Sequence, residues 1–306
     1  MQQVETTRLG RLRALALSPR AFRRLAALGA LMLFAIVATG ATVRLTASGL
    51  GCEHWPGCQP GNPFPASGFH SYIEFGNRMV AGLTILVTLL IAVAGFLTPR
   101  LPRRTAWLGV AVFLGTLAQA PLGAITVYLD LHPLIVMPHL LLSILLLGGA
   151  VLILLDGLRL ERGDREPALP EEVRRFVPLL PAACFGLLVS GAFATAAGPH
   201  SGGEEVTRFG TLDVALVFHA AAVALFGLGL IFLLGYLAAR RDRSPLALRG
   251  AAGVALLTVI QMGLGELQYR THLPWGLVLA HVAVSAAVWA GTVALASLVR
   301  RPLARA

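Results

Sequence analysis

Long stretches of hydrophobic residues, separated by short polar segments, repeat along most of this chain. A membrane-spanning helix needs about 20 apolar residues, and eight stretches come close to or exceed this length. They cover residues 24–43, 74–97, 105–127, 134–155, 177–196, 213–238, 249–268 and 275–299. Because a backbone in lipid must satisfy its own hydrogen bonds, such spans are helical. The pattern therefore predicts an all-α membrane protein with eight transmembrane helices.

Composition and charge agree with this class and indicate an orientation. Hydrophobic residues make up 56% of the chain and charged residues 13%, which is typical of membrane proteins. The net charge of +10 comes from arginine alone, because the sequence contains no lysine. The arginines cluster before the first span and after the second, fourth, sixth and eighth spans. By the positive-inside rule we expect both termini in the cytoplasm, and this basicity does not indicate nucleic-acid binding.

Polar positions inside the spans repeat at a fixed spacing. Asn77 and His139 lie 62 residues apart, as do His219 and His281, and 142 residues separate the two pairs. The same spacing of 142 relates two further pairs, which are Gln119 with Gln261 and Gly123 with Gly265. The repeat predicts two tandem four-helix bundles that run in parallel.

Three of the four equivalent positions are histidines, each roughly one or two helical turns inside a span. Ionisable groups in hydrocarbon are costly and usually functional. Histidines on facing helices of a bundle most often bind a metal, and haem is the leading candidate. With the expected orientation, these groups lie toward the outer face. The alternative interpretation is a set of polar residues that hydrogen-bond between helices.

The first outer loop has the most specific local sequence, RLTASGLGCEHWPGC at residues 44–58. Cys52 and Cys58 could form a disulfide or bind a metal. An oxidising outer compartment favours the disulfide, and a redox role for the pair is a further hypothesis. Cys184 is alone within the fifth span, where we expect it to contribute to packing.

Glu74, Asn77 and Arg78 are spaced i, i+3 and i+4, so they share one face of the second span. Glu74 could transfer protons or position water, or form an ion pair with Arg78, and these roles are compatible. Arg44 and Arg78 are candidates to bind haem propionates, because a guanidinium pairs bidentately with a carboxylate. Arg44 could instead extend toward the membrane interface.

The 44–58 loop, the sequence IEFGNR at 73–78 and the duplicated helices together resemble the haem A synthase family over residues 24–299. This resemblance implies an oxidoreductase that converts the methyl group of haem O to a formyl group through a hydroxylated intermediate. It implies haem O as substrate in the first half and haem b in the second half. His219 and His281 match the axial ligands of haem b, and His139 matches a ligand of the substrate haem.

Two further residues also match the family, and one position departs from it. Glu74 matches an acidic residue of the family, and Arg78 matches the arginine that follows a first-half ligand. Asn77 stands where the family usually has that ligand histidine, and a neutral amide is a poor iron ligand. The substrate iron would then be held by His139 alone, with Asn77 as a distal residue. A second possibility is that a loop histidine, His70 or His132, completes the coordination.

A second departure concerns the loop at 196–211, where some family members carry another cysteine pair and this chain does not.

The expected organisation is a cytoplasmic tail (1–23), a first half with the substrate site (24–156), a linker (157–176), a second half with haem b (177–299) and a tail (300–306). The outer cysteine loop covers 44–72.

The resemblance places the protein in the plasma membrane of a bacterium, in the cytochrome oxidase assembly pathway. Association with haem O synthase and self-association are both compatible with this role. A bis-histidine cytochrome b that carries electrons is the alternative function. A transporter is a third class, although its polar groups would be expected near the midplane of the membrane.

Overall fold

The computed structural model describes residues 16–55, 57–65, 67–163, 169–198, 210–241 and 244–303, and its named elements are all helices. Within these residues, eight helical segments are long and apolar enough to cross a membrane. The long helices are α2 (Pro19–Leu45), α3 (Phe69–Leu97), α4 (Arg103–Tyr128), α5 (Pro133–Arg162), α7 (Leu179–Ala197), α8 (Leu212–Ala239), α9 (Pro245–Arg270) and α10 (Trp275–Arg300). A short helix, α6 (Glu171–Phe176), precedes α7. Each predicted span coincides with one long apolar helix, so the eight predicted helices are confirmed.

Several segments considered in the sequence analysis lie outside the described residues. They are the N-terminal arginines up to residue 13, the middle of the linker at 164–168, and most of the loop after α7.

The helices extend beyond the apolar stretches, and capping residues explain the difference. α2 begins at Pro19 rather than at residue 24, because the Ser18 side chain accepts a hydrogen bond from the Ala21 amide at 3.2 Å and Pro19 occupies the first turn. α5 continues to Arg162 and ends at Gly163, whose φ of 88° favours glycine. Part of the expected linker at 157–176 is therefore helical. Hydropathy identifies the lipid-crossing part of a helix, whereas caps determine where the helix ends.

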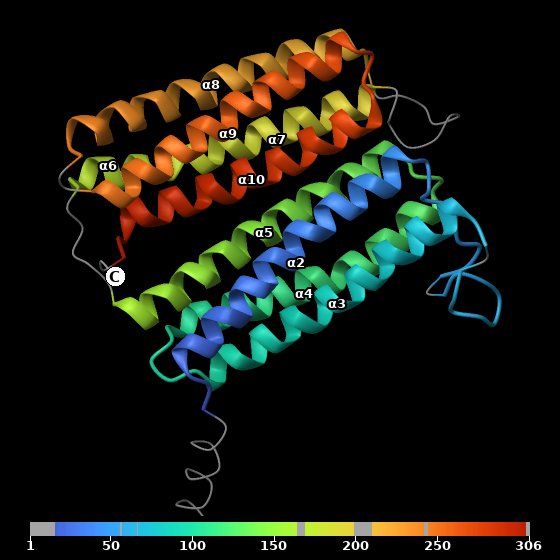
Figure 1. Cartoon of the computed structure of the whole chain (residues 1–306), viewed down its shortest axis with the longest axis horizontal. Coiled ribbons are helices and arrows are strands. Elements are labelled where there is room, and N and C mark those ends of the chain that lie inside the picture. Colours follow the sequence, from blue (N-terminus) through green and yellow to red (C-terminus); the bar gives the residue numbers. More distant parts are fainter. Residues whose placement is uncertain are drawn as a thin grey trace, which may run out of the picture.

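The long helices form two groups of four, α2–α5 and α7–α10, which lie side by side (Figure 1). Within each group every helix contacts two others, so that each group is a closed four-helix ring. The groups meet mainly through α10, which contacts α2 and α5. The first group holds the candidate site described below.

Small residues allow close approach at helix contacts. A Cβ atom added at Gly95 of α3 would lie 3.0 Å from the Ala106 Cα of α4. At the contact between the groups, the Trp289 indole donates to the Ile144 carbonyl at 2.7 Å, and a Cβ at Gly148 would lie 2.9 Å from the indole nitrogen. Helices in membranes associate through such packing and hydrogen bonds, because lipid offers no hydrophobic driving force.

A buried polar network joins the two groups at the ends of α5 and α10. Asp156 accepts hydrogen bonds from Thr105 at 2.7 Å and from Arg159 at 2.9 Å. Arg159 also donates to the Ser297 hydroxyl at 2.8 Å and to the Arg301 carbonyl at 2.8 Å. Arg159 belongs to the arginine cluster after the fourth span, which the positive-inside rule explains by topology, but the residue is only 6% exposed. The clustering pattern alone could not distinguish a topological arginine from a structural one.

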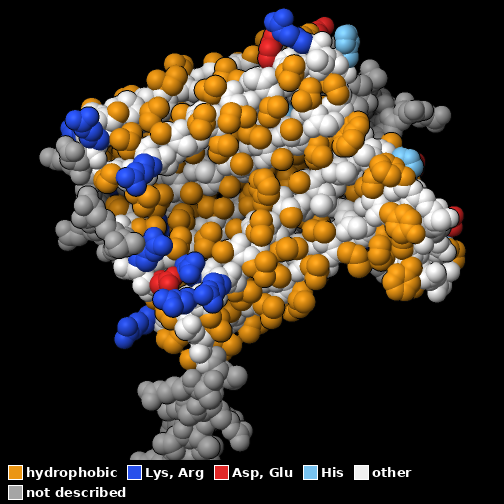
Figure 2. Space-filling model, in the orientation of Figure 1, with side chains coloured by type: hydrophobic (Ala, Val, Ile, Leu, Met, Phe, Trp, Pro, Cys, Tyr) orange, Lys and Arg blue, Asp and Glu red, His pale blue; other side chains and the backbone are white. Residues whose placement is uncertain are grey.

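The visible surface between the two ends of the helices is mostly hydrophobic, and most of the visible basic side chains lie at the end away from the cysteine loop (Figure 2). This distribution fits a lipid-exposed belt with one basic end.

We predict that Arg159→Met destabilises the protein by about 3 kcal/mol, because it leaves a buried carboxylate short of a partner. The control is Arg175→Met, which breaks the ion pair between Arg175 and Glu171, whose side chains are 78% and 60% exposed; it should cost roughly 0.5 kcal/mol or less. Thermal unfolding in detergent measures both. Equal melting temperatures for the two variants would show that the network adds no stability.

Candidate functional site

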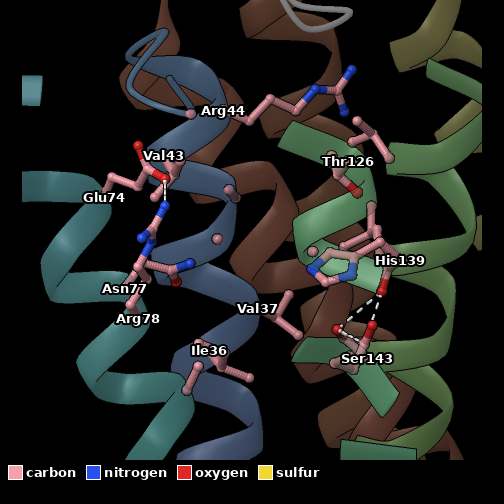
Figure 3. Close-up of a pocket in the computed structure, with 18 of the residues that line it drawn as sticks. Ile36, Val37, Val43, Arg44, Glu74, Asn77, Arg78, Thr126, His139 and Ser143 are labelled. Atoms are coloured by element: carbon pink, nitrogen blue, oxygen red, sulfur yellow. Dashed lines mark hydrogen bonds and ion pairs between the residues drawn. The ribbon is translucent and has the colours of Figure 1, made fainter. Parts of the chain in front are cut away.

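A cavity of about 400 Å³ lies mainly among the helices of the first group. Its polar lining includes all five residues that sequence analysis assigned to the substrate site, which are Arg44, Glu74, Asn77, Arg78 and His139. Figure 3 shows Glu74, Asn77 and Arg78 along α3 on one side of this space and His139 on the other. Most other lining residues are apolar. The cavity thus combines an apolar wall with a few polar groups, as ligand sites in proteins usually do.

Asn77 is held by a hydroxyl group on the neighbouring helix. The Thr39 hydroxyl of α2 donates to the Asn77 Oδ1 at 2.8 Å. The amide oxygen is therefore occupied, and the amide nitrogen points toward the His139 side of the cavity (Figure 3). Asn77 presents a hydrogen-bond donor to this space.

His139 is positioned by α4. The Gln119 side chain donates to the His139 carbonyl at 3.0 Å and to the Ser143 hydroxyl at 2.5 Å. A Cβ at Gly123 would lie 3.5 Å from the His139 Cε1, so the imidazole lies against α4 at this glycine. The Nδ1 atom of His139 is buried and has no hydrogen-bond partner among the described residues. The His139 imidazole is therefore available to a ligand in the cavity, and the backbone of this residue is held in place by Gln119.

Arg44 reaches from α2 toward the second group. Its Nη2 donates to the Thr195 carbonyl of α7 at 3.4 Å, and its Nε is buried without a partner in the part of the chain described. An unpaired guanidinium nitrogen in a cavity wall is suited to an anionic ligand group. This position differs from the interfacial extension that was the other interpretation of Arg44.

Glu74 and Arg78 form the expected ion pair, with 2.5 Å between the Glu74 Oε1 and the Arg78 Nη2. The pair also holds the cysteine loop. The other oxygen of Glu74 accepts from the Cys52 amide at 2.8 Å, and Arg78 donates to the His54 carbonyl at 2.7 Å and to the Gly57 carbonyl. We call Glu74 and Arg78 the loop clamp.

Cys52 and Cys58 are joined by a disulfide, and both are buried. The loop clamp contacts the backbone of this small ring at three residues, Cys52, His54 and Gly57. The candidate acid–base residue, the disulfide and one wall of the cavity therefore form a single connected structure.

The two loop histidines proposed as alternative ligands lie elsewhere. The His70 Nδ1 is 2.9 Å from the Ser48 hydroxyl, and the His132 side chain caps α5 by accepting from the Leu134 amide at 3.3 Å. Both residues are exposed, and neither lines the cavity. This arrangement favours His139 as the single histidine of the first site.

In the second group, α8 carries His219 and α10 carries His281. A glycine faces each imidazole, because a Cβ at Gly191 or Gly265 would lie 3.1 or 3.2 Å from the respective Cε1. The Gln261 side chain donates to the His281 carbonyl at 3.0 Å. This contact matches the Gln119 contact with His139 in the first group.

The structure also reveals a correspondence that the spacing of 142 misses. Thr39 precedes Gly40 and contacts Asn77, just as Ser190 precedes Gly191 and contacts His219. These hydroxyl–glycine pairs are 151 residues apart. The connection between α2 and α3 is therefore nine residues longer than the connection between α7 and α8, and it contains the cysteine loop. A sequence search at a second spacing could have found this pair.

The fold and site define a multi-pass helical membrane protein with histidines facing the interior of both helix groups. The COX15-CtaA family of cytochrome oxidase assembly proteins matches residues 23–67 and 63–198, more than half of the chain, and the chain belongs to this family. A protein of Shewanella oneidensis named heme A synthase is 27% identical over 299 residues, which cover 80% of this chain and 87% of the relative.

A second relative with the name heme A synthase, from Geobacillus kaustophilus, is 34% identical over 140 residues. That alignment covers 44% of this chain and 42% of the relative. A third, from Bacillus licheniformis, is 34% identical over 125 residues, or 40% of this chain and 41% of the relative.

We predict that Arg78→Lys loosens the cysteine loop, because one ammonium group cannot reach the same carboxylate and carbonyl partners. Hydrogen bonds of charged groups contribute about 1.5–3 kcal/mol each, so local opening should increase about tenfold or more. Hydrogen exchange of the 52–58 segment measures this opening. The control is Arg270→Lys in the exposed Glu266–Arg270 pair, which should leave exchange in the loop unchanged. If the 52–58 segment of the Arg78→Lys variant exchanged as slowly as that of the unmodified protein, the loop clamp would be contradicted.

Proposed function

We propose that this protein is a haem A synthase that oxidises the methyl group of haem O to a formyl group through a hydroxylated intermediate. The observation that carries the proposal is the first-group cavity, where His139, Asn77 and Arg44 converge from three different helices. The names of the three relatives point to the same activity. The product would supply terminal oxidases, which agrees with a family of cytochrome oxidase assembly proteins.

Haem O, the substrate, binds in the first-group cavity. His139 supplies the axial nitrogen for its iron, since imidazole is a common haem ligand. Arg44 pairs with a propionate, and its unpartnered Nε supports this role. Arg78, the other propionate candidate, already holds the cysteine loop, so we assign the propionate to Arg44.

Asn77 acts on the side of the substrate opposite His139. An amide does not replace a histidine as ligand, and Thr39 already occupies its oxygen. The iron of haem O, held by His139, would then have no second protein ligand in this cavity, and the Asn77 amide nitrogen would offer a hydrogen bond in the space on that side. A bis-histidine site would leave no such opening.

The second group binds haem b through His219 and His281. The glycines that face the two imidazoles fit this pair, because they leave room for each ring to lie against the neighbouring helix. When bound, haem b supplies one-electron transfer. The protein contributes the two imidazoles, their orientation and an apolar surrounding.

Glu74 is the candidate catalytic carboxylate. It lines the cavity and also contacts the Cys52 amide, so it links the substrate site to the disulfide. We assign it the positioning of water or the transfer of protons near the reacting methyl group. A redox role for Cys52 and Cys58 rests on this same connection.

The protein lies in a bacterial plasma membrane with both termini in the cytoplasm and both haem sites toward the outer face. The two helix groups are tandem parallel repeats, and their boundaries are those predicted above from the amino-acid sequence. The arginine clusters and the matching contacts of Gln119 and Gln261 support these assignments. Haem O synthase is the partner that would deliver the substrate. The first-group cavity, which is separate from the proposed haem b site, favours an enzyme over a cytochrome b that only carries electrons.

The first test is haem extraction and chromatography of the full protein, purified from cells that also make haem O. We expect haem b together with haem O, its hydroxylated form or haem A. His139→Ala should abolish the oxidised products while haem b remains, and His281→Ala should reduce haem b. Recovery of haem b alone from the unmodified protein would support the electron-carrier alternative.

A second test addresses the open axial position. Asn77→His would close the substrate iron with two imidazoles, so we expect formation of haem A to fall at least about tenfold, the loss that corresponds to roughly 1.4 kcal/mol in the barrier. Product chromatography measures the activity, and absorption spectra report an additional low-spin haem. Unchanged or higher activity in this variant would rule out the proposed role of Asn77.

A further inference from the structure

The Ser190 hydroxyl group lies between a backbone carbonyl and a histidine that we assign to haem b. Its Oγ is 2.7 Å from the Leu187 carbonyl oxygen and 2.9 Å from the His219 Nδ1. We propose that Ser190 is a positioning residue that sets the tautomer of His219 so that Nε2 is free to bind iron. This inference rests on the proposed haem b site.

The number of hydrogens determines the direction of both hydrogen bonds. A serine hydroxyl carries one hydrogen, and a carbonyl oxygen can only accept. At 2.7 Å the two oxygens need that hydrogen between them, so Ser190 donates to Leu187. The His219 Nδ1 must then be the donor to Ser190. In a neutral imidazole with a protonated Nδ1, Nε2 has the free lone pair that a metal requires.

The same contact also fixes the position and basicity of the ring. Gly191 follows Ser190 in α7, and a Cβ there would lie 3.1 Å from the His219 Cε1, so the glycine makes room for this approach. An acceptor on the non-ligating Nδ1–H orients a ligand histidine and raises its electron donation to the metal.

The other two histidines assigned to haem lack this arrangement. The Nδ1 atoms of His139 and His281 are buried, and neither has a side-chain hydroxyl as partner within the described residues. In the first group the equivalent hydroxyl, Thr39, contacts Asn77 instead. Ser190 is therefore expected to influence haem b through His219.

The experiment uses the full protein with His139→Ala as background, so that only the second-group haem reports. Ser190→Ala removes the acceptor, and Ser190→Thr keeps a hydroxyl. The matched control is Ser285→Ala in α10, because the Ser285 Oγ makes the same kind of bond to the Val282 carbonyl at 2.7 Å. The measurements are the midpoint potential of haem b and its rate of transfer to apomyoglobin.

We expect Ser190→Ala to raise the midpoint potential, because weaker electron donation stabilises the ferric state less, and to speed haem loss about tenfold. Ser190→Thr should restore both values, and Ser285→Ala should match the background. An unchanged potential in Ser190→Ala, an equal shift in Ser285→Ala, or failure of threonine to restore the potential would overturn the inference. A background protein without a low-spin haem spectrum would instead refute the haem b site itself, and the inference with it.

Discussion

Every polar group inside this helical bundle must find its partner within the protein, because hydrocarbon offers none. Several threonines, including Thr84, Thr88 and Thr116, donate to carbonyls of their own helices. Against this background, buried polar atoms without a partner are informative. The Nε of Arg44 and the Nδ1 of His139 are two such atoms, and both residues line the cavity. The constraint that stabilises the bundle also marks where a polar ligand is expected.

The two helix groups make similar contacts around the residues that we propose as haem ligands. A glutamine donates to the carbonyl of a histidine in each group, and a hydroxyl–glycine pair lies beside the second proposed position. The difference is at that position, where Asn77 corresponds to His219. We relate this one difference to the proposed division of work, in which a site with two imidazoles transfers electrons and a site with one keeps an axial position open.

The loop clamp connects the outer loop to the cavity. Glu74 and Arg78 were assigned chemical roles from their spacing, and the structure adds a mechanical one, since together they contact the backbone at Cys52, His54 and Gly57. A change in either residue would therefore alter the loop as well as the site. The contacts of Glu74 and Arg78 therefore link the long segment between α2 and α3 to the proposed substrate cavity.

The sequence by itself determined the membrane class, the eight helices, and the charged residues and histidine that line the cavity. Span length and hydropathy are set by bilayer thickness and can be counted, and repeat spacing identified the equivalent positions. Only the tertiary structure decided the partners of the side chains, such as the burial of Arg159, the carbonyl contacts of Arg78 and the pairing of Ser190 with His219. These spans are apolar on nearly all sides, so their sequences carry little information on helix rotation, which decides which side chains meet.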